Sequence, residues 1–141
     1  MRKQIRQPAA TESGPSLKSR MAVLGHPIHP MLVVYPTAFL SMAFVTDLVF
    51  LWLQAGFWAQ VSYWLCIAGL ILGVLAGCVG AIDVLTIRSV RRHVSAWSHA
   101  VAAVMLLALA AAGVWLRHPD PGAAVWPWGL LQSGGATTMA V

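Results

Sequence analysis

Three long apolar runs constrain the fold of this chain more than any other feature of its sequence. They cover residues 30–53, 58–85 and 94–116, and at a helical rise of about 1.5 Å per residue each can cross a hydrocarbon core of about 30 Å. A fourth apolar segment, 123–131, is too short, because a crossing helix needs about 20 residues. We therefore expect an all-α, polytopic transmembrane helical bundle with three full spans and a short or incomplete fourth segment.

The composition supports a membrane location. Hydrophobic residues make up 59% of the 141-residue sequence and charged residues 9%, whereas soluble domains carry about 25% charged residues. Residues 1–24 contain basic, proline, serine and threonine residues without apolar periodicity, so we expect a disordered basic tail. The transmembrane domain would then cover 25–131, and residues 132–141 would form a flexible C-terminus.

The positions of the basic residues predict an orientation. Five of the nine Lys and Arg residues precede residue 21 and three more lie between Arg88 and Arg92, while the connection at 54–57 has none. Positive residues gather on the cytoplasmic side of membrane proteins, so we expect a cytoplasmic N-terminus. Basic clusters beside apolar spans anchor a chain at the bilayer surface, whereas nucleic acid would need a basic face with interleaved aromatic residues. Lipid is therefore the expected partner, and nucleic acid is not.

Four glycines in the second span are spaced as one smooth helix face. Gly69, Gly73 and Gly77 recur every four residues, and Gly80 follows one turn later. Such a face lets another helix approach closely, and we interpret the four residues as a helix-packing surface. Three helices alone would leave this face to lipid. We therefore expect a homo-oligomer, or another membrane subunit, to cover it.

Two histidines, each followed by proline, stand where the first span begins, in Gly25-His26-Pro27-Ile28-His29-Pro30. An ionisable residue inside a span is costly enough to suggest a function, and histidine suits metal ligation, haem ligation or proton transfer. The expected topology places several such side chains at the cytoplasmic ends of three helices, namely His26, His29, Asp83, His93 and His99.

These residues allow two ligand sets and a structural alternative. His29 and His99 could be the axial ligands of a b-type haem between helices. A transition metal could instead bind to a nitrogen and oxygen set of His26, His29, His99 and Asp83. Neither spacing is diagnostic. In the structural alternative, His29 caps the first helix and hydrogen-bonds a neighbouring chain end. His99 and Asp83 then pair with each other, or with Arg88, so that the same residues only lock helix ends.

Asp47 lies about five helical turns from His29, toward the other side of the bilayer. It is either half of a proton or ion path with Asp83, or a residue hydrogen-bonded at the outer interface near Thr46. The sequence contains no nucleophile and base pair, phosphate-binding loop or zinc-protease motif. We therefore name no catalytic residue and do not assign an enzyme.

The run from Gly25 to Val33, followed by Tyr35-Pro36 and later by Asp47, resembles the bacterial integral membrane family called domain of unknown function 2231. Gly80-Ala81-Ile82-Asp83 resembles the end of that family's second span, and the basic loop before His99 resembles the start of its third. The resemblance covers about residues 20–130. It implies a four-span, multi-pass protein of the bacterial cytoplasmic membrane, although Gln132 and the residues after it depart from the family's full fourth span.

Three hypotheses for function follow. The first is that the inner-leaflet histidines bind haem b or a metal for electron transfer. Some members of the family are joined to Rieske-type iron–sulfur domains, and this resemblance weakly favours electron transfer. The second hypothesis is a structural or accessory membrane subunit without a cofactor. The third, proton or ion transport, depends on Asp47 and Asp83 alone and lacks the inverted repeats of transporters.

Overall fold

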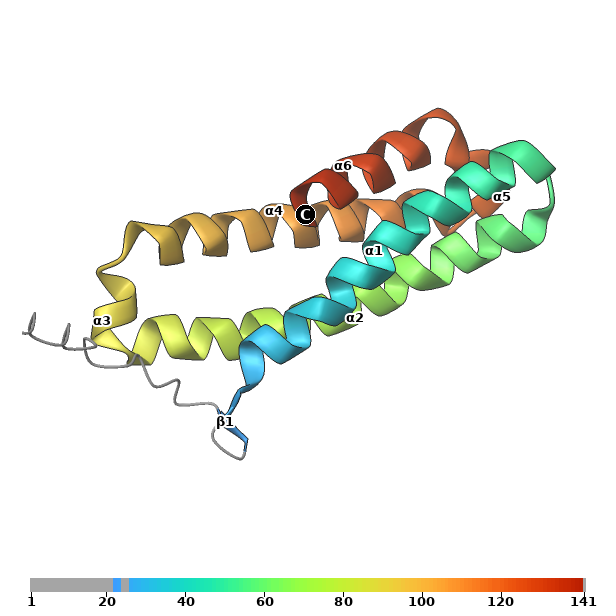
Figure 1. Ribbon diagram of the computed structural model, residues 1–141. Helices are drawn as coiled ribbons and strands as arrows, with labels where there is room; N and C mark the ends of the chain where they lie inside the picture. Colours follow the sequence, from blue (N-terminus) through green and yellow to red (C-terminus); the bar gives the residue numbers. More distant parts are fainter. Residues whose placement is uncertain (1–21, 24–25, 141) are drawn as a thin grey trace, which may run out of the picture.

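The computed structural model describes residues 22–23 and 26–140 and consists mainly of long helices (Figure 1). A short strand β1, Ala22–Val23, pairs antiparallel with β2, His26–Pro27. Apart from β1, the tail expected at residues 1–24 lies outside the described residues.

Three helices are long and apolar enough to cross a membrane, in agreement with the three expected spans. They are α1, Ile28–Leu53; α2, Gly56–Thr86; and α4, Val94–Arg117. Residues 54–55 join α1 to α2, and the short helix α3, Arg88–Arg91, lies between α2 and α4. Successive helices reverse direction, so α1 and α4 run parallel (Figure 1). We call the two ends of the bundle the α3 end and the 54–55 end.

The C-terminal segment folds back beside the other helices from the 54–55 end (Figure 1). Helix α5, Pro121–Ala124, begins at Asp120, whose side chain accepts hydrogen bonds from two backbone N–H groups. The π-helical segment η1, Val125–Gly129, bends at Trp126, which has φ −109° and ψ 132°. Because a residue before proline avoids the helical conformation, Pro127 accounts for the bend.

Helix α6, Leu130–Ala140, is 11 residues long and extends the short fourth segment beyond the expected 123–131. We predicted a flexible C-terminus at 132–141. In the structure, residues 132–140 are helical. Gln132 and Ser133, whose polarity interrupts the apolar run in the sequence, are buried inside the bundle. Their side chains are hydrogen-bonded to other helices, which makes a helix with polar residues stable here.

Helices α1 and α4 each pack against α2 and α6, which lie between them. The buried core at the level of α6 consists of Leu40, Ala110 and Ala136, with half-buried leucines around them. Helices α1 and α4 are therefore linked to each other chiefly through side chains, and this arrangement positions the polar groups described below.

The glycine face of α2 contacts α1 and α4 of the same chain. A Cβ atom added at Gly69 would lie 2.9 Å from Leu40, and one at Gly73 would lie 2.7 Å from Leu107. At Gly80 it would lie 2.7 Å from the ring of His29, and at Gly77 the nearest atom is 3.7 Å away. We expected a second copy or another subunit because the glycine face would otherwise be left to lipid. The packing of α1 and α4 on this face removes that reason. Association with either stays a prediction.

Candidate functional site

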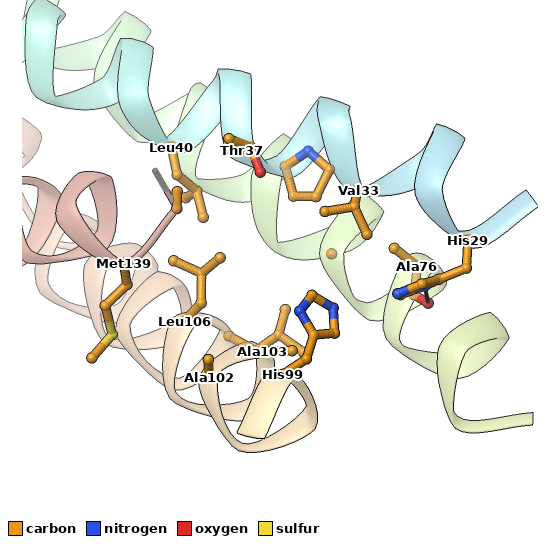
Figure 2. Close-up of a pocket in the computed structure, with 14 residues that line it drawn as sticks. His29, Val33, Thr37, Leu40, Ala76, His99, Ala102, Ala103, Leu106 and Met139 are labelled. Carbon is orange, nitrogen blue, oxygen red and sulfur yellow. Dashed lines mark hydrogen bonds between the residues drawn. The ribbon is translucent and has the colours of Figure 1, made fainter. Parts of the chain in front are cut away.

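His29 and His99 come together at the α3 end of the bundle, as the topology predicts. His29 lies in the first turn of α1 and His99 in the second turn of α4. Their ring centroids are 5.7 Å apart and the ring planes are nearly perpendicular, at 84°. In Figure 2 the two rings project from their helices toward one another, with the backbone of α2 beside His29.

One ring nitrogen of His29 is fixed by the backbone of α2. Its Nδ1 lies 2.9 Å from the carbonyl oxygen of Ala76, and because a carbonyl only accepts, Nδ1 carries the hydrogen and donates it. The neutral ring then keeps its lone pair on Nε2. His29 thus bonds to the backbone of a neighbouring helix.

The two histidines line a cavity between α1, α2, α4 and the end of α6 (Figure 2). Its volume is about 120 Å³, and with its open side the space between the lining side chains comes to about 630 Å³. Small residues form the walls on α2 and α4, namely Gly73, Ala76, Ala102 and Ala103. A second, more open groove of about 520 Å³ adjoins the cavity and shares Ala102 and Met139 with it.

Two other residues of the expected cluster, Asp83 and His93, do not line this cavity. Asp83 is half-buried on α2 and His93 is exposed just before α4. The side chain of His26 lies outside the described residues. Among the side chains that the structure describes, no group of three or more His, Cys, Asp or Glu residues could hold a metal ion. Of the four-residue metal set, the structure brings together His29 and His99.

A buried ion pair lies toward the 54–55 end. The Nη2 atom of Arg117, the last residue of α4, is 2.5 Å from Oδ2 of Asp47 on α1, and both side chains are fully buried. Arg117 also donates to Oε1 of Gln132 at 2.8 Å and to the carbonyl of Gly129 at 3.1 Å. The hydroxyl of Ser133 donates to Oδ2 of Asp47 at 2.6 Å. One cluster therefore joins α1, α4 and the C-terminal segment.

Neither expectation for Asp47 names this pairing. The partner of its carboxylate is Arg117, whereas the hydroxyl of Thr46 donates to the carbonyls of Met42 and Ala43. Arg117 falls just after the expected span 94–116, but it belongs to α4 and is buried. Opposite charges at the same ends of two parallel spans were the signal that could have indicated the pair.

Two atoms of the ion pair keep unused bonding capacity. Within the described chain, Oδ1 of Asp47 and Nε of Arg117 are buried without a hydrogen-bond partner. Cys66 on α2 is also buried, while Cys78, further along the same helix, is exposed.

Residues 25–141 match the model of the family described as Predicted membrane protein (DUF2231). The chain belongs to this family. A DUF2231 chain with three helices long enough to cross a bilayer sits in the membrane, and the resemblance noted from the motif at Gly25–Val33 is thereby confirmed. Searches of curated proteins and of solved structures found no match.

In this DUF2231 chain, polar side chains inside the bundle gather at two levels. The histidine pair lies near the α3 end and the ion pair near the 54–55 end, and each joins α1 to α4. Between the two levels the described interior is largely apolar, with Leu40, Leu106 and Ala110 among its residues. Ligand chemistry therefore belongs to the histidine level, where the cavity lies.

Proposed function

We propose that this protein binds haem b through His29 and His99 and takes part in electron transfer in the membrane. The observation that carries the proposal is the hydrogen bond from Nδ1 of His29 to Ala76, with the ring of His99 facing His29 at 5.7 Å. Metal-ligating histidines typically donate their other ring N–H to a carbonyl or carboxylate, which fixes the tautomer and raises the basicity of the ligating nitrogen. His29 has this arrangement.

A two-histidine site suits haem iron better than a bare metal ion. A porphyrin supplies four nitrogen ligands, so the protein adds only axial ligands, whereas a closed structural metal site takes about four protein ligands. The described residues offer two histidines and no group of three ligands. His26, three residues before His29, is the remaining candidate for a third ligand to a bare ion.

The space around the histidines is compatible with a planar cofactor. Glycine and alanine form the wall on α2 and part of the wall on α4, where they leave room between the helices. The enclosed volume of about 120 Å³ is smaller than the about 300–1,000 Å³ of typical ligand and cofactor sites, so a porphyrin would extend through the open side of the cavity. The adjoining groove adds volume on the same side.

Bound haem would supply reversible one-electron chemistry at its iron. The residues of the chain would hold the iron from two helices, keep the site apolar, and fix the plane of His29 through Ala76. The apolar lining of the cavity would lower the local dielectric and so influence the reduction potential.

The test is the visible absorption spectrum of the purified protein after haem is added. We expect a Soret band typical of two histidine ligands, which His29→Ala and His99→Ala each reduce strongly. His118→Ala is the matched control, because His118 is exposed beyond the end of α4. Protein that remains colourless with added haem, or a spectrum unchanged in both cavity variants, would overturn the proposal. Metal content without a Soret band, lost in His26→Ala, would indicate a bare ion instead.

The α3 end is proposed to face the cytoplasm of a bacterial cell, with the chain in the cytoplasmic membrane. Exposed Arg88, Arg91 and Arg92 near this end support that orientation through the excess of positive residues on the cytoplasmic side. The histidine site would then lie in the inner leaflet, where a cytoplasmic redox partner could reach it.

The buried cluster around Arg117 favours a second candidate, an accessory subunit without a cofactor. The cluster joins three parts of the bundle and gives the chain internal rigidity without any ligand. Absence of both haem and metal from protein purified out of native membranes would support this alternative.

A further inference from the structure

We propose that Asp47 and Arg117 form a positioning pair that sets the register of α1 against α4 and thereby holds His29 opposite His99. This inference rests on the proposed function, because a positioning role matters only if His29 and His99 form the ligand site. Its structural content can be tested without a cofactor.

The spacing along the two helices is the same. Asp47 follows His29 by eighteen residues on α1, and Arg117 follows His99 by eighteen residues on α4. Eighteen residues make five turns of about 3.6 residues and rise about 27 Å. Each helix therefore presents its histidine and its charged residue on one face, and the two parallel helices bring both pairs into contact in a single register.

The helix backbones themselves specify this register weakly. Helices α1 and α4 each pack on α2 and α6, so their mutual position depends on side chains. On α2, Gly69 and Gly73 have no side chains of their own, and Leu40 and Leu107 make only apolar contacts with them. A slide of one turn, about 5.4 Å, would separate both polar pairs at once.

The ion pair has the directionality that the apolar contacts lack. Its two charges are fully buried, and Arg117 is further held by Gln132 and the carbonyl of Gly129. A register change would leave both charges without a partner in an apolar interior, which is strongly unfavourable. The pair consequently resists sliding at the 54–55 end, and the rigid helices transmit that constraint to the histidines at the α3 end.

The first experiment measures the distance between the histidine positions without haem. Cys66 and Cys78 are replaced by alanine, cysteines are introduced as His29→Cys and His99→Cys, and crosslinking by a short bismaleimide is followed in detergent. We expect Arg117→Gln to slow crosslinking by about tenfold or more, since it leaves the charge of Asp47 uncompensated. The exchange Asp47→Arg with Arg117→Asp should restore part of the rate.

A matched control separates register from general loss of stability. Ser62 is buried and donates to the carbonyl of Ala43 on α1 without touching the ion pair. Ser62→Ala should therefore crosslink at the rate of the parent. Where Arg117→Gln does not remain monodisperse, Arg117→Lys and Ser133→Ala keep both charges and take its place, with slowing by a smaller factor expected.

The second experiment adds haem to the same ion-pair variants with both histidines present. We expect Arg117→Gln to shift the spectrum from two-histidine ligation toward a single axial ligand, with recovery in the charge exchange. Parent-like crosslinking in folded Arg117→Gln would overturn the positioning role even if haem binds. Slowed crosslinking in a protein that never binds haem would support the positioning role and overturn only the proposed function.

Discussion

The imidazole of His29, on α1, donates its Nδ1 hydrogen to the backbone carbonyl of Ala76, on α2, at 2.9 Å. Gly80, one turn further along α2, makes this contact possible, because a Cβ atom there would lie 2.7 Å from the ring. The position of the His29 ring thus depends on a glycine at position 80. The glycine face interpreted as a packing surface also shapes the candidate site.

Replacing Gly80 with alanine should disturb the His29 ring and weaken haem binding by about 10–100-fold, the usual effect of losing an outer-sphere contact. A haem titration followed by absorbance measures the change. Gly56→Ala is the control, since an added Cβ there meets nothing within 4 Å. Equal affinity in the Gly80 and Gly56 variants would contradict the role assigned to His29.

Removing one member of the buried ion pair should destabilise the protein far more than removing an exposed polar side chain. Asp47→Ala or Arg117→Ala leaves an uncompensated buried charge, which costs about 3–5 kcal/mol. Asp120→Ala removes only an exposed helix cap and should cost about 0.5–2 kcal/mol. Unfolding in mixed detergent and urea measures the free energy of unfolding of each variant. A similar loss of stability in the ion-pair variants and in Asp120→Ala would contradict the predicted cost of an unpaired buried charge.

Enlarging Gly73 tests whether the glycine face serves packing within one chain. Gly73→Leu should lower the thermal midpoint clearly, because even one added carbon would lie 2.7 Å from Leu107 on α4. Gly77→Ala should be tolerated, as its nearest contact is an ordinary 3.7 Å. Light scattering reports the association state alongside the midpoint. A Gly73→Leu protein of normal stability but smaller size would show that the face serves association between chains.

Cysteine labelling in intact cells tests the orientation. With Cys66 and Cys78 replaced, a cysteine at Ala55, in the exposed 54–55 connection, should react with an impermeant maleimide added outside the cytoplasmic membrane. A cysteine at Arg92, exposed near the α3 end, should react only after the membrane is opened. The reverse pattern would invert the proposed topology.

The sequence was sufficient for the three long helices because hydropathy alone determines which segments can cross a bilayer. Helix α6 could not be recognised in the same way. Gln132 and Ser133 lower its hydropathy, and their partners, Leu109 and Asp47, lie on helices that only the folded chain brings near. Hydropathy and periodicity are read along one segment at a time. Polar residues that hydrogen-bond to another helix are therefore mistaken for the end of a span.

The candidate site was predictable in part for a related reason. Topology alone brings the first turn of α1 and the start of α4 to the same end, so the meeting of His29 and His99 could be expected. The rotation of each helix about its own axis could not be predicted from the topology. This rotation decides that Asp83 does not line the cavity. The pairing of Asp47 with Arg117 depends on the same rotation and was missed.

The ion pair also has a consequence for biosynthesis. Its two members are 70 residues apart in the chain, and α1 leaves the ribosome well before α4. Asp47 therefore enters the bilayer as an uncompensated acid, and its charge is neutralised only when the end of α4 has been inserted beside it. The ion pair can therefore form only late in assembly, after all three long helices have been made.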